Sequence, residues 1–413
     1  MLHSLLGLVV LLFIAWLLSV DRRRVPWRMV LGGVGLQFAI AVLMLKVAPF
    51  SGLFMALNKL VLGMEEATRA GTSFVFGYLG GGPVPFPEPK PGQSFILAFQ
   101  ALPLVIVIGA LTSLLYYWRV LPCVVRGFSW VLRKSMGIGG ALGVGAAGTI
   151  FLGMIEAPLL IKPYLMELTR AELFALMATG LSCIAGTMLM LYAAVLGNVI
   201  PDALGHILTA SVIHAPAALA VAALMLPESG RPTLGEALPP SGAQGTMDAV
   251  AKGTWDGLQL FLNIIAMLIS FIALVKIVNL GLGCVPDVSG AALTVQRLLG
   301  WVLSPVAWLL GIPWAEAGTA GGLLGTKVAL NEFIAFIDLA NLPAGALSER
   351  TRLILAYAMC SFANFGSVGI IIGGIGALCP DRRAEIAGLG MRALAAGIIA
   401  SLMTGAVVGV LFA

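Results

Sequence analysis

Two carboxylates lie inside apolar, glycine-rich stretches of this chain. Glu156 stands near the middle of residues 145–163, and Glu332 follows Asn331 in a second stretch of this kind. A charge at the centre of a bilayer costs about 2.5 to 3.5 kcal/mol, so such a side chain is retained mainly where it has a partner, a cavity or a task. Both glutamates are therefore candidates for a functional site.

These residues offer hydrogen bonds and a flat apolar surface. A carboxylate accepts two hydrogen bonds from a vicinal diol or from ring N–H groups, and an asparagine both donates and accepts. A third stretch, residues 361–369, adds Phe362, Asn364 and Ser367. Phe362 could stack on a ring or belong to the core. The chemistry indicated is recognition of a polar solute that carries a ring.

Composition fixes the class of protein. Of the 413 residues, 60% are hydrophobic and only 10% are charged, and the mean hydropathy is +1.02. These values indicate an all-α polytopic membrane protein and exclude a soluble enzyme. The net charge of +5 is expected in loops, where it orients the chain, and we expect no nucleic-acid partner. The five cysteines are scattered, so we assign no firm metal site.

The hydropathy pattern predicts about eight transmembrane helices and two re-entrant hairpins. Residues 2–20 can span a bilayer, and Asp21 with three arginines follows them directly. By the positive-inside rule this cluster lies in the cytoplasm, which puts both the N-terminus and the C-terminus outside.

The remaining segments divide the chain into four expected parts. Residues 1–134 are expected to form scaffold helices with interfacial helices, including a basic amphipathic helix over 118–134 and an extended proline-rich connector over 80–92. Residues 135–226 should hold a first hairpin and a broken helix, and residues 227–299 a loop and a scaffold helix. Residues 300–413 should hold the second hairpin, over 303–340, and a second broken helix.

The chain repeats this arrangement. Gly148 and Thr149 precede Glu156 and an interrupted helix around Ser182, just as a second Gly-Thr pair precedes Glu332 and an interrupted helix around residues 364–367. Pro158 also disfavours a straight helix through the first stretch. One hairpin enters from each side, so the repeats are inverted. Paired broken helices in inverted repeats indicate the midplane site of a secondary transporter.

Three strings carry a resemblance to a known family. GTIFLGMIEAPLLIKPY, GTKVALNEF and FANFGSVGIIIGGIGAL are similar to motifs of the concentrative nucleoside transporters of the bacterial NupC type. The resemblance implies a homotrimer whose protomers each have a scaffold and an elevator-type transport domain. It also implies a substrate site in which the first hairpin contacts the nucleobase and the second hairpin contacts the ribose. The implied substrate-binding residues are Glu156, Met154, Ile155, Asn331, Glu332, Phe362, Asn364 and Ser367.

The chain departs from the family pattern in two places. Sodium-coupled members typically have Asn, Gln and Thr where this chain has Thr149, Met154 and Ile155. Loss of two polar side chains should weaken discrimination between nucleobases or shift it toward shape. The implied ion site comprises Thr149, Leu152, Cys183 and Ile184. A thiol is a poor ligand for sodium, so we expect a coupling ion that is H+ or Na+, with the proton preferred.

The expected function is cation-coupled uptake of nucleosides across the cytoplasmic (inner) membrane, with no cofactor. A carrier of a related solute such as a nucleobase stays open as an alternative. An intramembrane enzyme that uses Glu156 and Glu332 as acid and base is a different class, but no nucleophile with an adjacent base is visible, so we assign no catalytic residue. A channel would give flux without accumulation.

Overall fold

The structure is a computed structural model that describes residues 2–46, 63–64, 66–86, 95–197, 199–233, 242–284, 288, 292–343 and 345–412. The regular elements assigned within these ranges are helices, which confirms the expected all-α class. The expected interfacial segment lies partly in residues 47–62 and 65, and the proline-rich connector partly in residues 87–94. Those parts fall outside the described residues.

The helices follow one another in three groups. The first group contains α1 (Leu2–Leu17), α2 (Trp27–Lys46), η1 (Gly77–Gly80), α4 (Leu97–Gln100), α5 (Leu104–Tyr117) and α6 (Val120–Met136). The second contains α7 (Gly140–Thr149), α8 (Glu156–Leu160), η2 (Lys162–Tyr164), α9 (Arg170–Ser182), α10 (Gly186–Leu196) and α11 (Ala203–Met225). The third contains α12 (Thr246–Leu282), α13 (Val295–Leu309), α14 (Trp314–Ala329), α15 (Glu332–Ala340), α16 (Glu349–Met359), α17 (Phe365–Leu378), η3 (Pro380–Arg382) and α18 (Arg383–Leu411).

Both hairpins and both broken helices are present. The first hairpin is α7 with α8, and the helix expected to be interrupted after it divides into α9 and α10. The second hairpin is α14 with α15, which is shorter than the expected 303–340. Gly311, at a φ of 102°, and Pro313 separate α13 from α14, so α13 is a helix of its own that packs along α14. Helix α13 also spans the boundary expected between residues 299 and 300.

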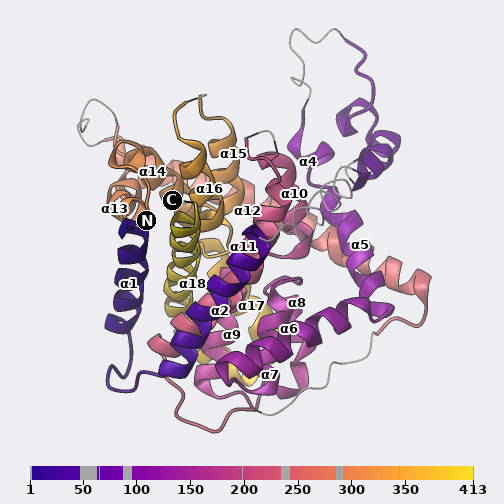
Figure 1. The fold of residues 1–413 in the computed structure, drawn as a ribbon. Helices are drawn as coiled ribbons and strands as arrows, with labels where there is room; N and C mark the ends of the chain where they lie inside the picture. Colours follow the sequence, from indigo (N-terminus) through magenta and orange to yellow (C-terminus); the bar gives the residue numbers. More distant parts are fainter. Residues whose placement is uncertain are drawn as a thin grey trace.

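The two repeats run in opposite directions. Figure 1 shows α7 and α8 in the lower part of the molecule and α14 and α15 in the upper part. Likewise α9 lies low and α10 high, whereas α16 lies high and α17 low (Figure 1). The two chain ends lie together at the upper side (Figure 1).

Two long helices form the centre of the described structure. Within the described residues, four helical segments are long and apolar enough to cross a membrane: Trp27–Lys46, Leu97–Tyr117, Ala203–Met225 and Pro380–Leu411. Protein buries 94% of the most apolar window of Ala203–Met225 and 78% of that of Pro380–Leu411, but only 22% and 28% of the other two. Helices α11 and α18 are therefore the protein-facing core, while α2 and α5 present apolar side chains outward.

Each hairpin packs against the broken helix of the other repeat. At the tip of the first hairpin, Ile155 lies against Gly374 of α17. A Cβ added at Gly374 would be 2.8 Å from Cγ1 of Ile155. In the second hairpin, Phe333 and Phe336 pack on Tyr192 of α10, with ring centroids 6.1 and 5.2 Å apart. The repeats are thus interlocked, so neither can form its part of the site alone.

Helices α5 and α12 touch through their backbones. A Cβ added at Gly109 would lie 2.7 Å from the carbonyl oxygen of Gly253, and one at Gly257 would lie 2.8 Å from the Cα of Ile106. Small residues allow this approach, as is common where helices pack in membranes. The pair is therefore a tight unit at the side of the core.

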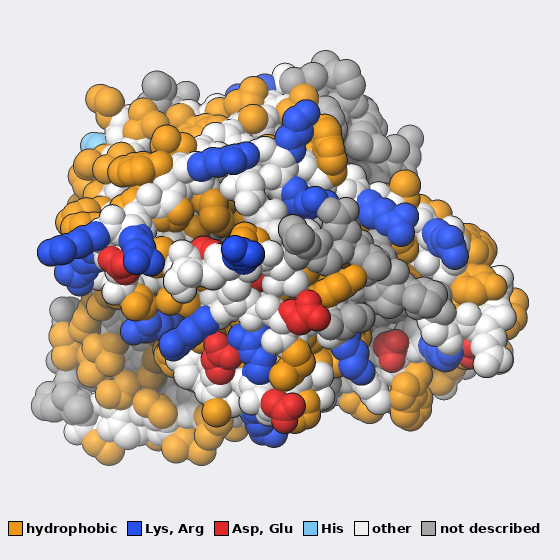
Figure 2. All heavy atoms as spheres, turned by 90° about the horizontal axis from the view of Figure 1, so that it is seen from below, with side chains coloured by type: hydrophobic (Ala, Val, Ile, Leu, Met, Phe, Trp, Pro, Cys, Tyr) orange, Lys and Arg blue, Asp and Glu red, His pale blue; other side chains and the backbone are white. Residues whose placement is uncertain are grey.

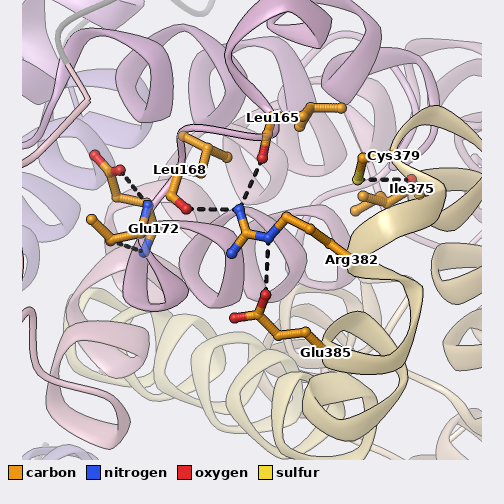
Figure 3. A network of polar contacts seen from close by, with 8 residues as sticks. Leu165, Leu168, Glu172, Ile375, Cys379, Arg382 and Glu385 are labelled. Atoms are coloured by element: carbon orange, nitrogen blue, oxygen red, sulfur yellow. Dashed lines mark hydrogen bonds and ion pairs between the residues drawn. The ribbon is translucent and has the colours of Figure 1, made fainter.

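Arg382 joins the two repeats at the lower end of the molecule. Its Nη1 donates to the carbonyl oxygens of Leu165 and Leu168 at 2.9 and 2.7 Å, and its Nε pairs with Glu385 at 2.9 Å (Figure 3). The segment after the first hairpin is thereby attached to the start of α18.

Arg350 caps helix ends at the opposite side. Its guanidinium donates to the carbonyl oxygens of Gly311, Gly409 and Phe412, the last two at 2.7 and 3.0 Å. These carbonyls belong to the ends of α13 and α18, whose last turns lack intrahelical partners. One side chain therefore satisfies several groups that apolar surroundings would leave unpaired.

Replacing Arg350 by Met should destabilise the protein by about 2 to 4 kcal/mol, because charge-assisted bonds are lost and carbonyls are left unpaired. Thermal unfolding of the purified protein in detergent would measure this as a lower Tm. The control is Arg24→Met, since the Arg24 side chain is 68% exposed in a surface ion pair. An equal Tm for the two variants would contradict the capping role.

Candidate functional site

The two helix breaks meet at the centre of the fold. Residues 183–185 separate α9 from α10, and residues 360–364 separate α16 from α17. Gly397 of α18 lies between them, because a Cβ added there would be 3.1 Å from both Leu181 and Ala363. The unwound backbone of both repeats is thereby buried together, as non-helical backbone at membrane depth requires.

Glu332 is the buried carboxylate of this region. It begins α15, is 3% exposed, and accepts a hydrogen bond on each oxygen. Tyr192 Oη donates to Oε1 at 2.5 Å, and Asn364 Nδ2 donates to Oε2 at 3.1 Å. The positive end of the helix dipole also favours a carboxylate here. Each oxygen keeps a lone pair, so the group can accept further hydrogen bonds from a solute.

The two predicted asparagines cap the helices that follow them. Asn331 Oδ1 accepts from the N–H of Ile334, and Asn364 Oδ1 accepts from the N–H of Ser367, both at 2.9 Å. Asparagine is a preferred N-cap because its side chain satisfies a free N–H in the first turn. Their oxygens therefore hold the second hairpin and α17 in shape, a role that the sequence prediction did not include.

Several predicted residues are brought together in the second repeat. Asn364 and Ser367 are 4% exposed, Phe362 is half-buried, and Glu332 reaches Asn364 directly. Asn331 is half-buried beside Glu332. Glu332 of the second hairpin and Asn364 of the following break thus belong to one polar cluster, and its contact with a solute stays a prediction.

The first-hairpin candidates have more packed surroundings. Met154 is 8% exposed and lies against Gly180 of α9. A Cβ added at Gly180 would be 3.1 Å from the Cβ of Met154. Ile155 is half-buried against Gly374. Glu156 begins α8, and its side chain lies outside the described part of the structure. Contact of these residues with a nucleobase stays a prediction.

The residues predicted for the ion lie where the first hairpin meets the first break. The Phe151 carbonyl accepts from the N–H of Gly186 at 3.0 Å, which joins the two segments. The Cys183 thiol donates to the Ser211 carbonyl at 3.6 Å and lies beside the Thr149 side chain. Leu152 and Ile184 are buried in the same region of the core.

Ser211 of α11 supplies an oxygen that the sequence prediction missed. Its hydroxyl donates to the Ile150 carbonyl at 3.1 Å, and the Thr149 hydroxyl donates to the Ala146 carbonyl at 2.8 Å. A hydroxyl that donates its hydrogen still presents lone pairs to a cation. Each of these hydroxyl oxygens is therefore a candidate ligand for a hard cation, whereas the Cys183 thiol does not suit one.

Lys327 is the buried cation of the second hairpin. It is 1% exposed, and its Nζ donates to the Ala363 carbonyl at 2.7 Å. It also interacts electrostatically with Glu332. The sequence prediction assigns Lys327 no role, although a lysine in an apolar, glycine-rich stretch itself indicates a functional site. Tyr192 gave no such signal, because an aromatic residue in an apolar helix is ordinary.

Comparisons with known proteins cover the whole chain. The family description "Na+ dependent nucleoside transporter N-terminus" matches residues 6–79, "Nucleoside recognition" matches residues 98–199, and "Na+ dependent nucleoside transporter C-terminus" matches residues 206–409. The chain is 37% identical to the uncharacterized transporter YutK of Bacillus subtilis, over 99% of the chain and 98% of YutK. It is 33% identical to the nucleoside permease NupC of Helicobacter pylori, over 99% of the chain and 97% of that protein.

The fold is similar to solved structures of the transporter CNTnw. Its inward-facing substrate-bound state matches with a TM-score of 0.89 and 35% identity, covering 100% of this chain and 99% of that one. Variants of CNTnw in an outward-facing and an intermediate state match with TM-scores of 0.88 and 0.89. The relatives are transporters, which excludes an enzyme. From its motifs, its fold and these matches, the chain belongs to the concentrative nucleoside transporter family.

Proposed function

We propose that this protein carries out cation-coupled, secondary active uptake of nucleosides. The observation that carries the proposal is the buried Glu332 carboxylate at the start of α15, held by Tyr192 and Asn364. Such a group suits two neighbouring hydroxyls, because a carboxylate can accept a hydrogen bond on each oxygen. A vicinal diol is what distinguishes a ribonucleoside from a free nucleobase, the alternative solute.

The proposed pocket places the solute between the two hairpins. Glu332 and Asn331 bind the ribose, and Phe362, Asn364 and Ser367 complete the pocket beside them. Glu156 binds the nucleobase, with Met154 and Ile155 next to it. The mutual packing of each hairpin on the other repeat supports this arrangement, since it draws both hairpin tips toward the two breaks.

The proposed transport movement is an elevator in a homotrimer. The hairpins and broken helices form the mobile part, and α5 with α12 belongs to the scaffold. The tight glycine contact between α5 and α12 supports this division. The large outward apolar side chains of α12, such as Met247, Ile269 and Ile277, suit contact with lipid or with another protomer.

The proposed location is the cytoplasmic membrane, with both chain ends outside. The face seen from below in Figure 2 carries many Lys and Arg side chains among fewer Asp and Glu. It is the end opposite to the two termini in Figure 1. Positive residues favour the cytoplasmic side, which supports this orientation.

The coupling ion is proposed to be a proton, with sodium as the second candidate. The thiol of Cys183 and the lack of an asparagine at Thr149 disfavour sodium, and Glu156 is then the preferred proton carrier over Glu332. The Ser211 hydroxyl favours sodium, because it adds an oxygen at the carbonyl of Ile150, the residue after Thr149. In either case one charge that crosses about 100 mV supplies about 2.3 kcal/mol, roughly fifty-fold accumulation.

Glu332→Gln should weaken uridine binding about tenfold or more. Tyr192 and Asn364 both donate to the carboxylate, so the amide NH2 of a glutamine would face a donor. Uptake of uridine and of 2′,3′-dideoxyuridine would be compared in proteoliposomes. Uptake of uridine should fall more than uptake of 2′,3′-dideoxyuridine, because only uridine carries the diol. Glu349→Gln, at an exposed position of α16, is the control. An equal fall in uptake of both solutes would show that Glu332 does not bind the ribose hydroxyls.

Met154→Gln combined with Ile155→Thr should sharpen the choice among nucleobases. The double variant restores two polar side chains at the tip of the first hairpin, and polar groups reject a base that leaves them unpaired. Competition of unlabelled nucleosides with labelled uridine measures the profile. Leu159→Gln, at an exposed position of the same hairpin, is the control. A profile unchanged from wild type would show that these two positions do not read the base.

The coupling ion is tested with imposed gradients. Under a pH gradient without sodium, proteoliposomes should accumulate uridine, and a sodium gradient at symmetric pH should drive little accumulation. Ser211→Ala separates the two candidates further, because it removes a hydroxyl that only sodium needs as a ligand. If only the sodium gradient drives uptake and Ser211→Ala lowers the apparent sodium affinity, the proton proposal fails.

A further inference from the structure

The ammonium group of Lys327 is buried where a charge is costly. Burying an ion is unfavourable unless hydrogen bonds and nearby opposite charge compensate for the lost water. Lys327 Nζ donates to the Ala363 carbonyl in the second break, and Glu332 supplies opposite charge. The side chain starts on α14 and ends on the break, so it fastens the second hairpin to the unwound segment.

The two breaks hold equivalent places on α11. The residue after α9 is Cys183, whose thiol donates to the Ser211 carbonyl at 3.6 Å. The residue after α16 is Cys360, whose thiol donates to the Ile207 carbonyl at 3.9 Å. Ile207 and Ser211 are four residues apart, which puts them on one face of α11. In both repeats, therefore, the first residue of the break bonds to a backbone carbonyl of α11.

The hairpins differ at one position of this repeated arrangement. Both contain Gly-Thr near the end of their first helix, and the next residue is Ile150 in the first hairpin and Lys327 in the second. The first hairpin meets its break through the backbone, from Gly186 N–H to the Phe151 carbonyl, with the candidate ion residues around this bond. The second hairpin meets its break through side chains, namely the Lys327 ammonium and the bond between Glu332 and Asn364.

We infer that Lys327 is a tethered cation, which occupies in the second repeat the place that the exchangeable coupling ion takes in the first. The inference rests on the proposed cation-coupled function. The first hairpin then keeps its backbone bond to Gly186 and gains a cation at this place only when an ion is bound, whereas the second hairpin always has the Lys327 cation. The ion dependence of transport comes from the first repeat, and Lys327 is a positioning residue that holds the hairpin bearing Glu332.

The test is chemical rescue of Lys327→Ala. The shortened side chain leaves room for a small alkylammonium ion that carries the same charge and N–H donors. Uridine uptake by Lys327→Ala should fall at least about tenfold, since a charge-assisted hydrogen bond is lost. Ethylammonium should restore it in part. Tetramethylammonium, which has the charge but no N–H donor, should not. Lys276→Ala, at an exposed position of α12, is the matched control and should behave as wild type.

Two results would overturn the inference. One is a folded Lys327→Ala protein whose uptake ethylammonium does not improve. The other is a Lys327→Met protein with wild-type uptake, because it would show that apolar volume suffices at this position. Where Lys327→Ala is too unstable for uptake measurements, its Tm in detergent replaces them. Ethylammonium should raise the Tm of this variant and not that of wild type, and an equal response would contradict the inference.

The proposed function and this inference fail separately. Wild-type protein that takes up no nucleoside would contradict the proposed function. The Tm comparison uses no nucleoside, so it reports on the tethered cation by itself.

Discussion

The constraint on which the rest of this structure depends is the cost of unpaired backbone groups in an apolar interior. Both broken helices expose N–H and C=O groups at the centre of the fold, where water is not available to satisfy them. The protein supplies partners one by one. Asn364 caps α17, Asn331 caps α15, and Lys327 donates to the carbonyl of Ala363. The polar residues of the site are therefore the residues that make an interrupted backbone stable.

These two roles explain why polar residues of the site can be buried. Glu332 and Asn364 bond to each other, Glu332 also accepts from Tyr192, and Asn364 caps α17, so their geometry is set before a solute arrives. A preorganised site loses little free energy in ordering its side chains on binding. The same bonds also limit which groups can move without breaking the helix ends.

Much of the fold could be predicted because glycine, proline and hydropathy act locally. The stretch around Gly148, Gly153 and Pro158 predicts a hairpin, and the structure has a turn there between α7 and α8. The start of the second hairpin was predicted too far upstream, since the turn at Gly311 depends on a backbone conformation that composition does not reveal.

The site was predicted less completely, because its contacts join distant parts of the chain. Tyr192 and Glu332 are 140 residues apart and meet only when the repeats interlock. Ser211 lies in an apolar helix with no local pattern that marks it as a neighbour of Thr149. The asparagine caps could have been found from the chain alone, since each asparagine directly precedes a helix.

The position of Gly397 has a mechanical meaning. This residue of α18 lies against both Leu181, just before the first break, and Ala363, within the second. A close-packed interior transmits small displacements directly. Gly397 thus lies between the segment that leads into the first break and the backbone of the second break. A displacement of one break can therefore act on the other break directly. The absence of a side chain at Gly397 sets how closely the two breaks can approach each other.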